Sequence, residues 1–348
     1  MGACNRFRNR LPYGIMTTIR DVARQAGVSI ASVSRVVNGR EGVGTEITER
    51  VRQAVSELGF QPNSVASSLK TARTHILACV IPDISNPFFP ELVRAVEDAA
   101  RAAGYATLLC NTDDDPDKEA DYLRLLDRRR VDGLILIPCH DEAPPAALLH
   151  LAARGTPVIV VDRRMDGFAC DIVLTDNRRG GRLAARHLLE LGHRRIGILN
   201  RAPDTSTARE RDAGFRAELS PAGAYDPALV RLGRYNLESG RAMAADLLAS
   251  PVRPTAILAG NDLLAIGALQ AAADLGLRVP EDLSVVGFDG ILLSQAVVPR
   301  LTTVAQPIYR LGELAVQLVL RPPDRTRRPR THLLRPELRI GRSAGRAP

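Results

Sequence analysis

From residue 75 onward, short apolar runs alternate with amphipathic segments, and this alternation restricts the fold more than any other feature. The intervening segments are about 11–17 residues long, have helical periodicity and end at glycines such as Gly104 and Gly192. We expect strands at 76–81, 105–110, 133–138, 158–162, 171–175, 195–200, 255–259 and 283–287. Such alternation predicts parallel sheets covered by helices on both faces.

The strand pattern breaks near residue 175, which predicts two doubly wound lobes instead of one. We place the first lobe at about 75–175 and 306–320. The second lobe is expected at about 176–304 and 321–345, with a final strand within 331–341. A chain of 348 residues also leaves room for a separate unit before residue 75.

Residues 17–61 carry the pattern of a helix-turn-helix unit. Thr18 can cap a first helix, Gly27 supplies a tight turn, and Ser29 can cap a second helix over 30–38. A third amphipathic helix follows and ends at Gly59. In this motif the second helix enters the major groove of DNA. A plain three-helix bundle with a solvated basic face is the alternative.

The exposed side chains of the second helix determine what it can contact on DNA. Arg35 can form two hydrogen bonds with a guanine edge, whereas Ile30 and Ala31 can offer only apolar contact, for instance to a thymine methyl. Hydroxyl and amide groups suit contacts with phosphates. The expected polar DNA contacts are Thr18, Ser29, Ser32, Ser34 and Asn38.

The formal net charge of +8 is unevenly distributed. Residues 1–75 carry +6, residues 321–348 carry +7, and the part between them carries −5. A basic head on a mildly acidic body indicates that the head meets a polyanion. The chain shows no apolar run of bilayer length and no signal-peptide core, and its five cysteines form no CxxC pair. We therefore expect a cytoplasmic protein without a membrane partner, associated with the nucleoid when bound to DNA.

Polar residues directly after the expected strands are candidates for a ligand site, because ligands of doubly wound sheets bind at the carboxyl ends of strands. Carboxylates, amides and guanidinium groups can hydrogen-bond to vicinal hydroxyls, and adjacent phenylalanines can pack on a sugar ring. The candidates are Asp83, Asn86, Phe88, Phe89, Asp162, Arg163, Asp176, Asn261 and Asp289, together with Arg211, which begins a helix. Each one alone could be a helix cap, a surface ion pair or a core residue. Their joint placement favours sugar binding.

The stretches TTIRDVARQAGVSIASVSRVVNG (17–39) and VRQAVSELGFQPNSVASSLKT (51–71) resemble the headpiece of the lactose-repressor/galactose-repressor family. The resemblance implies that 62–74 is a hinge helix or linker, with Asn63 as its cap and Leu69 as a wedge in the minor groove. Family proteins start close to TTIRDVA. Residues 1–16 are therefore expected to be a disordered extension or a misassigned start.

Residues 75–345 are similar to this family's effector-binding domain and to periplasmic sugar-binding proteins, through IPDISNPFF, RRVDGLIL, LLELGHRRIGIL, NDLLAIGAL and LSVVGFDG. The pocket pattern is most similar to that of ribose-binding members, which adds Tyr235 and Gln306 to the candidates. The resemblance implies control by D-ribose or a related pentose or polyol. It also implies a homodimer on a pseudo-palindromic double-stranded operator, with dimer contacts from first-lobe helices such as the one beginning near Pro87.

The expected fold is thus an all-α helix-turn-helix headpiece followed by a two-lobed α/β domain similar to periplasmic binding proteins. We expect a sequence-specific, allosterically controlled repressor without catalytic residues, cofactor or metal. The chain lacks GxSxG, Walker, HExxH and strand-linked GxGxxG motifs, which argues against a carbohydrate kinase or dehydrogenase. An exported sugar-binding protein, the other alternative, would carry an export signal and no headpiece.

Overall fold

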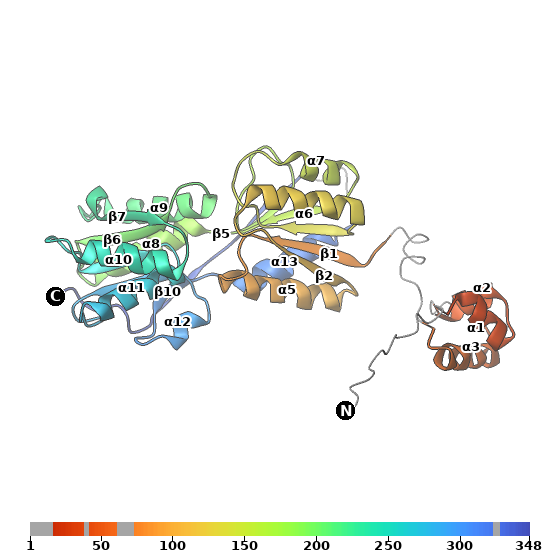
Figure 1. The fold of residues 1–348 in the computed structure, drawn as a ribbon. Helices are drawn as coiled ribbons and strands as arrows, with labels where there is room; N and C mark the ends of the chain where they lie inside the picture. Colours follow the sequence, from red (N-terminus) through yellow and green to blue (C-terminus); the bar gives the residue numbers. More distant parts are fainter. Residues whose placement is uncertain (1–16, 38–41, 61–72, 323–327) are drawn as a thin grey trace, which may run out of the picture. The chain divides into compact units, whose positions relative to one another are not determined.

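The computed structural model describes residues 17–37, 42–60, 73–322 and 328–348 (Figure 1). The chain divides into two compact units, one that precedes His75 and one that begins at His75. Asn38, Asn63 and Leu69 lie outside the described residues, as do the expected extension 1–16 and most of the expected hinge 62–74. Predictions for those positions stay predictions.

The first unit is a bundle of three short helices. They are α1 (Ile19–Ala26), α2 (Ile30–Val37) and α3 (Thr45–Glu57). Their apolar faces meet in one small core, as the periodicity of the sequence predicts. The buried members of this core are Val22, Ala23, Ala26, Val33, Val51, Ala54 and Phe60.

The helix ends follow the local signals. The Ser29 hydroxyl accepts a hydrogen bond from the Ser32 N–H at 3.1 Å and so caps α2. At the start of α1 the Asp21 carboxylate is the acceptor, and it receives both the N–H (3.0 Å) and the hydroxyl (2.6 Å) of Thr18. Gly27 ends α1 in the left-handed region, with φ of +64°.

We expect Gly27→Ala to destabilise this unit by about 1–2 kcal/mol, because an L-residue is strained at that φ. A Cβ there would also stand 2.6 Å from Arg50 Nη2, which donates to the Ala26 carbonyl at 2.5 Å. Hydrogen exchange of the α1–α3 amides in the full chain measures the loss. Gly59→Ala is the matched control, because Gly59 has a φ of +57° and an added Cβ would meet no atom within 4 Å. Equal effects would show that the Arg50 contact is unimportant.

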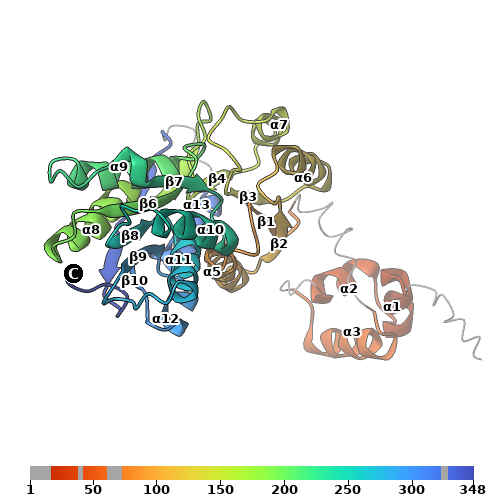
Figure 2. The ribbon, with the colours of Figure 1, turned by 60° about the vertical axis from the view of Figure 1, so that its left-hand side comes forward.

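The second unit consists of two lobes, each built on a six-stranded sheet (Figures 1 and 2). The first sheet is entirely parallel, in the order β11-β5-β4-β3-β1-β2. Its strands are β1 (Ile76–Ile81), β2 (Ala106–Asn111), β3 (Gly133–Leu136), β4 (Val158–Val161), β5 (Asp171–Thr175) and β11 (Thr331–Leu334).

The second sheet has the order β12-β10-β9-β8-β6-β7 and is parallel except for its edge strand β12, which runs antiparallel to β10. Its strands are β6 (Ile196–Arg201), β7 (Val230–Gly233), β8 (Ala256–Ala259), β9 (Ser284–Asp289), β10 (Thr302–Ala305) and β12 (Glu337–Arg339).

Helices cover both faces of each sheet (Figure 1). In the first lobe, α5 (Phe88–Ala102) and α13 (Ile308–Val319) lie on one face, opposite α6 (Pro116–Arg129) and α7 (Ala146–Ala153). Strand β1 shows why two faces are needed: Leu77, Cys79 and Ile81 pack against α5 and α13, while Ala78 and Val80 point the other way.

The second lobe is covered in the same manner. Helices α8 (Asn177–Glu190) and α9 (Ser206–Leu219) lie on one face, and α10 (Leu237–Leu248) and α11 (Asp262–Asp274) on the other. Two one-turn elements complete the lobe. They are the 3₁₀ turn at Pro227–Leu229 before β7 and α12 (Leu293–Ala296) after β9. No described helix is long and apolar enough to cross a membrane.

The predicted break near residue 175 is present, because β5 ends the first passage through lobe one and α8 begins lobe two. The assignment of 321–345 to the second lobe is wrong in part. β11 pairs with β5 in the first sheet and only β12 joins the second, so the single strand expected within 331–341 is two strands. Pro336 separates them, because proline has no N–H to donate to a sheet. The expected strands also missed β7 and β10, which have four residues each.

Candidate functional site

The surface of α2 presents the residues expected to contact DNA. Val33 is buried in the three-helix core, while Ile30 is 46% exposed and Ala31 and Arg35 are also exposed. Ser29 and Thr18 are exposed at the starts of α2 and α1, and Ser32 and Ser34 are half-buried. One face of the helix is therefore fixed by the core, and the other displays a guanidinium, hydroxyls and small apolar groups.

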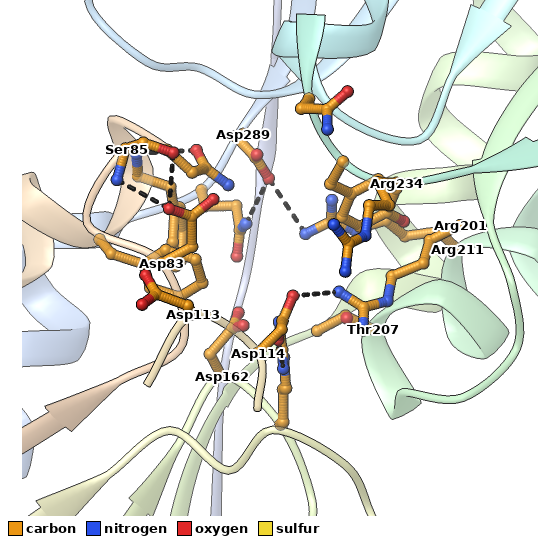
Figure 3. A pocket seen from close by; sticks show the side chains of 17 residues that line it. Asp83, Ser85, Asp113, Asp114, Asp162, Arg201, Thr207, Arg211, Arg234 and Asp289 are labelled. Carbon is orange, nitrogen blue, oxygen red and sulfur yellow. Dashed lines mark hydrogen bonds and ion pairs between the residues drawn. The ribbon is translucent and has the colours of Figure 1, made fainter. Parts of the chain in front are cut away.

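A cavity of about 270 Å³ lies between the two lobes of the second unit, at the carboxyl ends of their strands (Figure 3). Ten of the twelve ligand-site candidates line it, and they come from both lobes. These ten are Asp83, Asn86, Phe88, Phe89, Asp162, Arg163, Arg211, Tyr235, Asp289 and Gln306.

Arg211 is the central cation of the cavity. Its buried guanidinium forms an ion pair with Asp289 Oδ1 at 3.0 Å and donates to the Gly260 carbonyl at 2.5 Å. It also donates to Asn177 Oδ1 at 2.8 Å, and its Cζ lies 3.9 Å from the Phe288 ring centroid. A guanidinium with so many fixed contacts has one orientation, which suits precise recognition of a small ligand.

Asp289 is held from two sides. It pairs with Arg211, and its Oδ1 accepts a hydrogen bond from Gln306 Nε2 at 2.8 Å. Burial raises the pKa of Asp289 to about 6, although Arg211 and Gln306 act in the opposite direction. Its carboxylate therefore changes charge just below neutral pH.

Three residues that line the cavity each carry one buried side-chain atom without a hydrogen-bond partner among the described residues. These atoms are Asp162 Oδ1, Arg163 Nε and Gln306 Oε1. A buried polar atom left unpaired costs about 1–3 kcal/mol, so residues of this wall retain unused hydrogen-bonding capacity. Two acceptors and one donor match hydroxyl groups, which can donate and accept.

Asp162 and Asp289 share unusual backbone angles. Their φ values are +64° and +112°, although neither residue is glycine. Backbone strain of this kind costs about 1–3 kcal/mol and is concentrated at functional sites. Asp262 helps to maintain the turn after Asp289, because its buried carboxylate accepts from the N–H groups of Gly290 (2.8 Å) and Ile291 (2.9 Å).

The apolar part of the wall consists of two phenylalanines at the start of α5. Phe88 and Phe89 are both buried, with ring centroids 5.1 Å apart in an edge-to-face arrangement. Asn86 Oδ1 accepts from the Phe88 N–H at 3.2 Å, which fixes the turn that leads into the helix. On the second lobe, the Tyr235 hydroxyl donates to Asn200 Oδ1 at 2.6 Å. The cavity thus combines ring faces with charged hydrogen-bonding groups.

Two candidates lie elsewhere, and their expected place in the cavity is wrong. Asp176 caps α8 by accepting from the Arg179 N–H at 2.9 Å, and Asn261 caps α11 by accepting from the Leu264 N–H at 2.9 Å. Both follow strands, as predicted. Their side chains turn toward the next helix instead of the ligand site, because each helix leaves N–H groups that need an acceptor.

Sequence reasoning missed several residues of the cavity wall. They are Ser85, Asp113, Asp114, Arg201, Thr207, Arg234 and Asn236. Asp113 and Asp114 follow β2 and Arg201 is the last residue of β6, so the strand-end rule could have found them. Within the described ranges, no group of three or more His, Cys, Asp or Glu side chains is placed to hold a metal ion.

Comparison with known families divides the chain at the same place as the structure. A model described as "Bacterial regulatory proteins, lacI family" matches residues 18–63. A second, described as "Periplasmic binding proteins and sugar binding domain of LacI family", matches residues 74–332.

Curated relatives match over most of their length. The chain is 42% identical over 300 residues to the HTH-type transcriptional regulator DegA of Bacillus subtilis, covering 85% of this chain and 88% of that protein. It is 40% identical over 306 residues to the ribose operon repressor of Halalkalibacterium halodurans, covering 88% and 90%.

Solved structures agree with the fold. The lac repressor dimer bound to operator and an anti-inducer superimposes with a TM-score of 0.83 at 29% identity, covering 94% of this chain and 99% of that one. A LacI-family regulator from Enterococcus faecium with bound ribose gives a TM-score of 0.70 at 32% identity, covering 78% and 98%. Both units of the chain therefore have counterparts of known structure.

Proposed function

Because the chain belongs to the LacI family of bacterial regulatory proteins, and is thus a DNA-binding transcriptional regulator and not an enzyme, we propose that it is a repressor controlled by a small neutral sugar. Its effector is D-ribose or a related pentose or polyol. Residues 17–61 bind DNA, 62–74 link the units, and 75–345 hold the effector. The protein acts in the cytoplasm, where its DNA target lies.

DNA recognition is assigned to α2. In a dimer, two copies of α2 occupy successive major grooves of a pseudo-palindromic operator, with Arg35 directed at a guanine. The relative of known structure that is bound to operator is itself a dimer. The helix α5, which begins next to Pro87 as the sequence predicts, remains our candidate for dimer contacts.

The unpaired atoms of residues that line the cavity carry the assignment of a neutral polyhydroxylated ligand. Asp162 Oδ1 and Gln306 Oε1 need donors, and Arg163 Nε needs an acceptor. The guanidinium groups of Arg211 and Arg163 already have carboxylate partners, in Asp289 and Asp114 respectively. An anionic ligand would compete with those carboxylates for the arginines, whereas hydroxyl groups can form hydrogen bonds without displacing them. Ribose is favoured among such sugars because two relatives are named for ribose or contain it.

The effector and the operator are coupled through the arrangement of the lobes. A sugar that contacts both lobes stabilises their closed arrangement, and the headpiece is attached to the first lobe at residue 75. By linkage, a sugar that lowers operator affinity must itself bind more weakly to the operator complex. Measuring ribose affinity with and without operator DNA therefore tests induction directly.

The proposal is tested by thermal unfolding against a panel of pentoses, hexoses, polyols and nucleosides. A genuine effector at 100 times its Kd should stabilise the protein by about 2.7 kcal/mol. The chain has no tryptophan, so an added dye reports unfolding. The matched control is Asp289→Asn, which keeps the shape of the side chain but loses its charge. If no sugar shifts the wild-type midpoint, the effector assignment is wrong.

We expect ribose affinity to fall as the pH drops through about 6. The sugar hydroxyl donates to ionised Asp289, so proton binding to that carboxylate competes with sugar binding. With a pKa of about 6, affinity at pH 5 should be about tenfold lower than at pH 7. Calorimetric titrations at pH 5, 6, 7 and 8 measure this.

The contribution of Asp289 to the stability of the fold changes with pH in the opposite direction to its contribution to ribose affinity. The raised pKa means that the folded state binds this proton more tightly than the unfolded chain, so Asp289 alone favours folding more at pH 5 than at pH 7. Thermal unfolding measured without sugar at each pH therefore gives the baseline against which the effect of ribose is compared. A pH-independent affinity between pH 5 and 8 would contradict a role for ionised Asp289.

A further inference from the structure

The ligand cavity has a neighbour. A second, more open cleft of about 470 Å³ also lies between the lobes and is bordered by residues such as His140 and Leu232. The two spaces share only Asp114, Arg201 and Arg234 among the described residues that line them. These side chains therefore form the partition between the inner cavity and the outer cleft.

An ion pair spans the lobes at this partition. Asp114 follows β2 in the first lobe, and Arg201 ends β6 in the second. Arg201 Nη1 lies 2.6 Å from Asp114 Oδ2, and the two side chains are only 10% and 24% exposed. Figure 3 shows Asp114 directed across the gap toward the arginines of the second lobe.

Each partner of this ion pair also has a second partner within its own lobe. Asp114 Oδ1 accepts from Arg163 Nη1 at 2.9 Å, and Arg201 Nε and Nη2 lie 2.9 and 3.1 Å from the two carboxylate oxygens of Asp204. Burial raises the pKa of Asp114, but Arg163 and Arg201 outweigh it and hold the pKa below its usual value, so the carboxylate stays charged. The cross-lobe pair can open without leaving a buried charge unpaired, which is the main cost of breaking such pairs.

We propose that Asp114 and Arg201 form a gate that limits the effector to a single sugar ring. When the pair is closed, the inner cavity ends at these side chains, and a ligand with a second ring would have to pass between them into the outer cleft. When the pair opens, the sugar can enter or leave. This inference rests on the proposed sugar-binding function, and it makes the partition a determinant of ligand size.

The test is Arg201→Ala, studied as the full-length protein by calorimetry with D-ribose and with ribosides that carry a second ring at C1 or at C5. Wild type should bind ribose and neither extended riboside. The variant should bind at least one extended riboside at least about tenfold more tightly than wild type does. Dissociation of ribose from the variant should also be faster. Asp114→Ala removes the other half of the gate and gives the same test should Arg201→Ala fold poorly.

Asp141→Asn is the matched control. Asp141 and Arg209 form another cross-lobe ion pair with the same 2.6 Å separation, but neither residue lines the inner cavity or the outer cleft. The asparagine can still accept from the Ser206 hydroxyl, which lies 3.3 Å from Asp141 Oδ1. This variant weakens closure of the lobes but leaves Asp114 and Arg201 paired. Its affinity for the extended ribosides should therefore not rise above that of wild type.

The outcomes separate the two levels of inference. If wild type binds no pentose, the sugar-binding function itself is wrong. If wild type binds ribose but neither gate variant gains an extended riboside, the gate is wrong and the function stands. The gate is equally overturned if wild type already binds extended ribosides as tightly as ribose, or if Asp141→Asn gains them to the same degree.

Discussion

Arg211→Ala should abolish the response to pentoses while operator binding survives. The change removes the ion pair with Asp289 and the hydrogen bonds to Gly260 and Asn177. Breaking a buried pair by removing one partner costs about 3–5 kcal/mol, because the other charge stays buried. The unfolding midpoint should therefore fall, and ribose should no longer raise it. Thermal unfolding with and without ribose, combined with operator binding, measures all three effects.

Two variants make this result specific. Arg209→Ala removes an arginine from the same helix that lies outside the cavity wall and pairs with Asp141 across the lobes, so ribose should bind more weakly through looser closure but its response should not be abolished. Arg211→Lys keeps a positive charge beside Asp289 but loses the planar fork of donors, so ribose should bind more weakly than to wild type. A normal ribose response in Arg211→Ala would show that the cavity is not the effector site.

Arg35→Ala is expected to weaken operator binding by about 1–3 kcal/mol, or roughly five- to 150-fold, and to relax the preference at one base pair. Arg35 is exposed on the face of α2 opposite buried Val33, so its loss should not affect the three-helix core. Ribose binding should be unchanged, because the effector domain is a separate compact unit. Titration of operator variants with single base changes measures both affinity and preference.

Arg24→Ala is the comparison for this effect. Arg24 lies in the last turn of α1 and not on α2, and its side chain is 81% exposed and pairs with Asp21. It should alter the salt dependence of binding slightly and leave base preference intact. A footprint of Arg35→Ala identical to that of wild type would place the recognition surface elsewhere.

Local signals explain why much of the fold was predictable from sequence. The turn at Gly27 and the cap at Ser29 involve residues within three positions of each other, and both appear as predicted. The strands that carry Asp162 and Asp289 are short apolar runs followed at once by a polar residue. The strand-end rule depends only on that sequence pattern, and it supplied most of the ten candidates that line the cavity, whereas Tyr235 and Gln306 came from the family resemblance.

Several of the failures depended on contacts between distant residues, and others on what a polar side chain at a strand end contacts. β11 joins the first sheet because it pairs with β5, about 160 residues earlier in the chain. No local pattern distinguishes a strand-end Asp that faces a ligand, such as Asp162, from one that caps the next helix, such as Asp176. The strand-end rule could have named Asp114 and Arg201 one by one, but their ion pair exists only because the two lobes meet, and no local pattern predicts that contact.

The late arrival of β11 and α13 has a consequence for biosynthesis. Strands β1 to β5 are complete once residue 175 has been made. The helix that covers their sheet, α13, is made only with residues 308–319, and the strand that extends the sheet, β11, only with residues 331–334. At about 5–20 residues per second, residues 176–330 take roughly 8–30 s to translate. During that interval the nascent first lobe exposes apolar surface that Leu311 and Val316 will later bury. We therefore expect chaperones to protect the nascent chain until translation is nearly finished, and chains that terminate before residue 331 to aggregate.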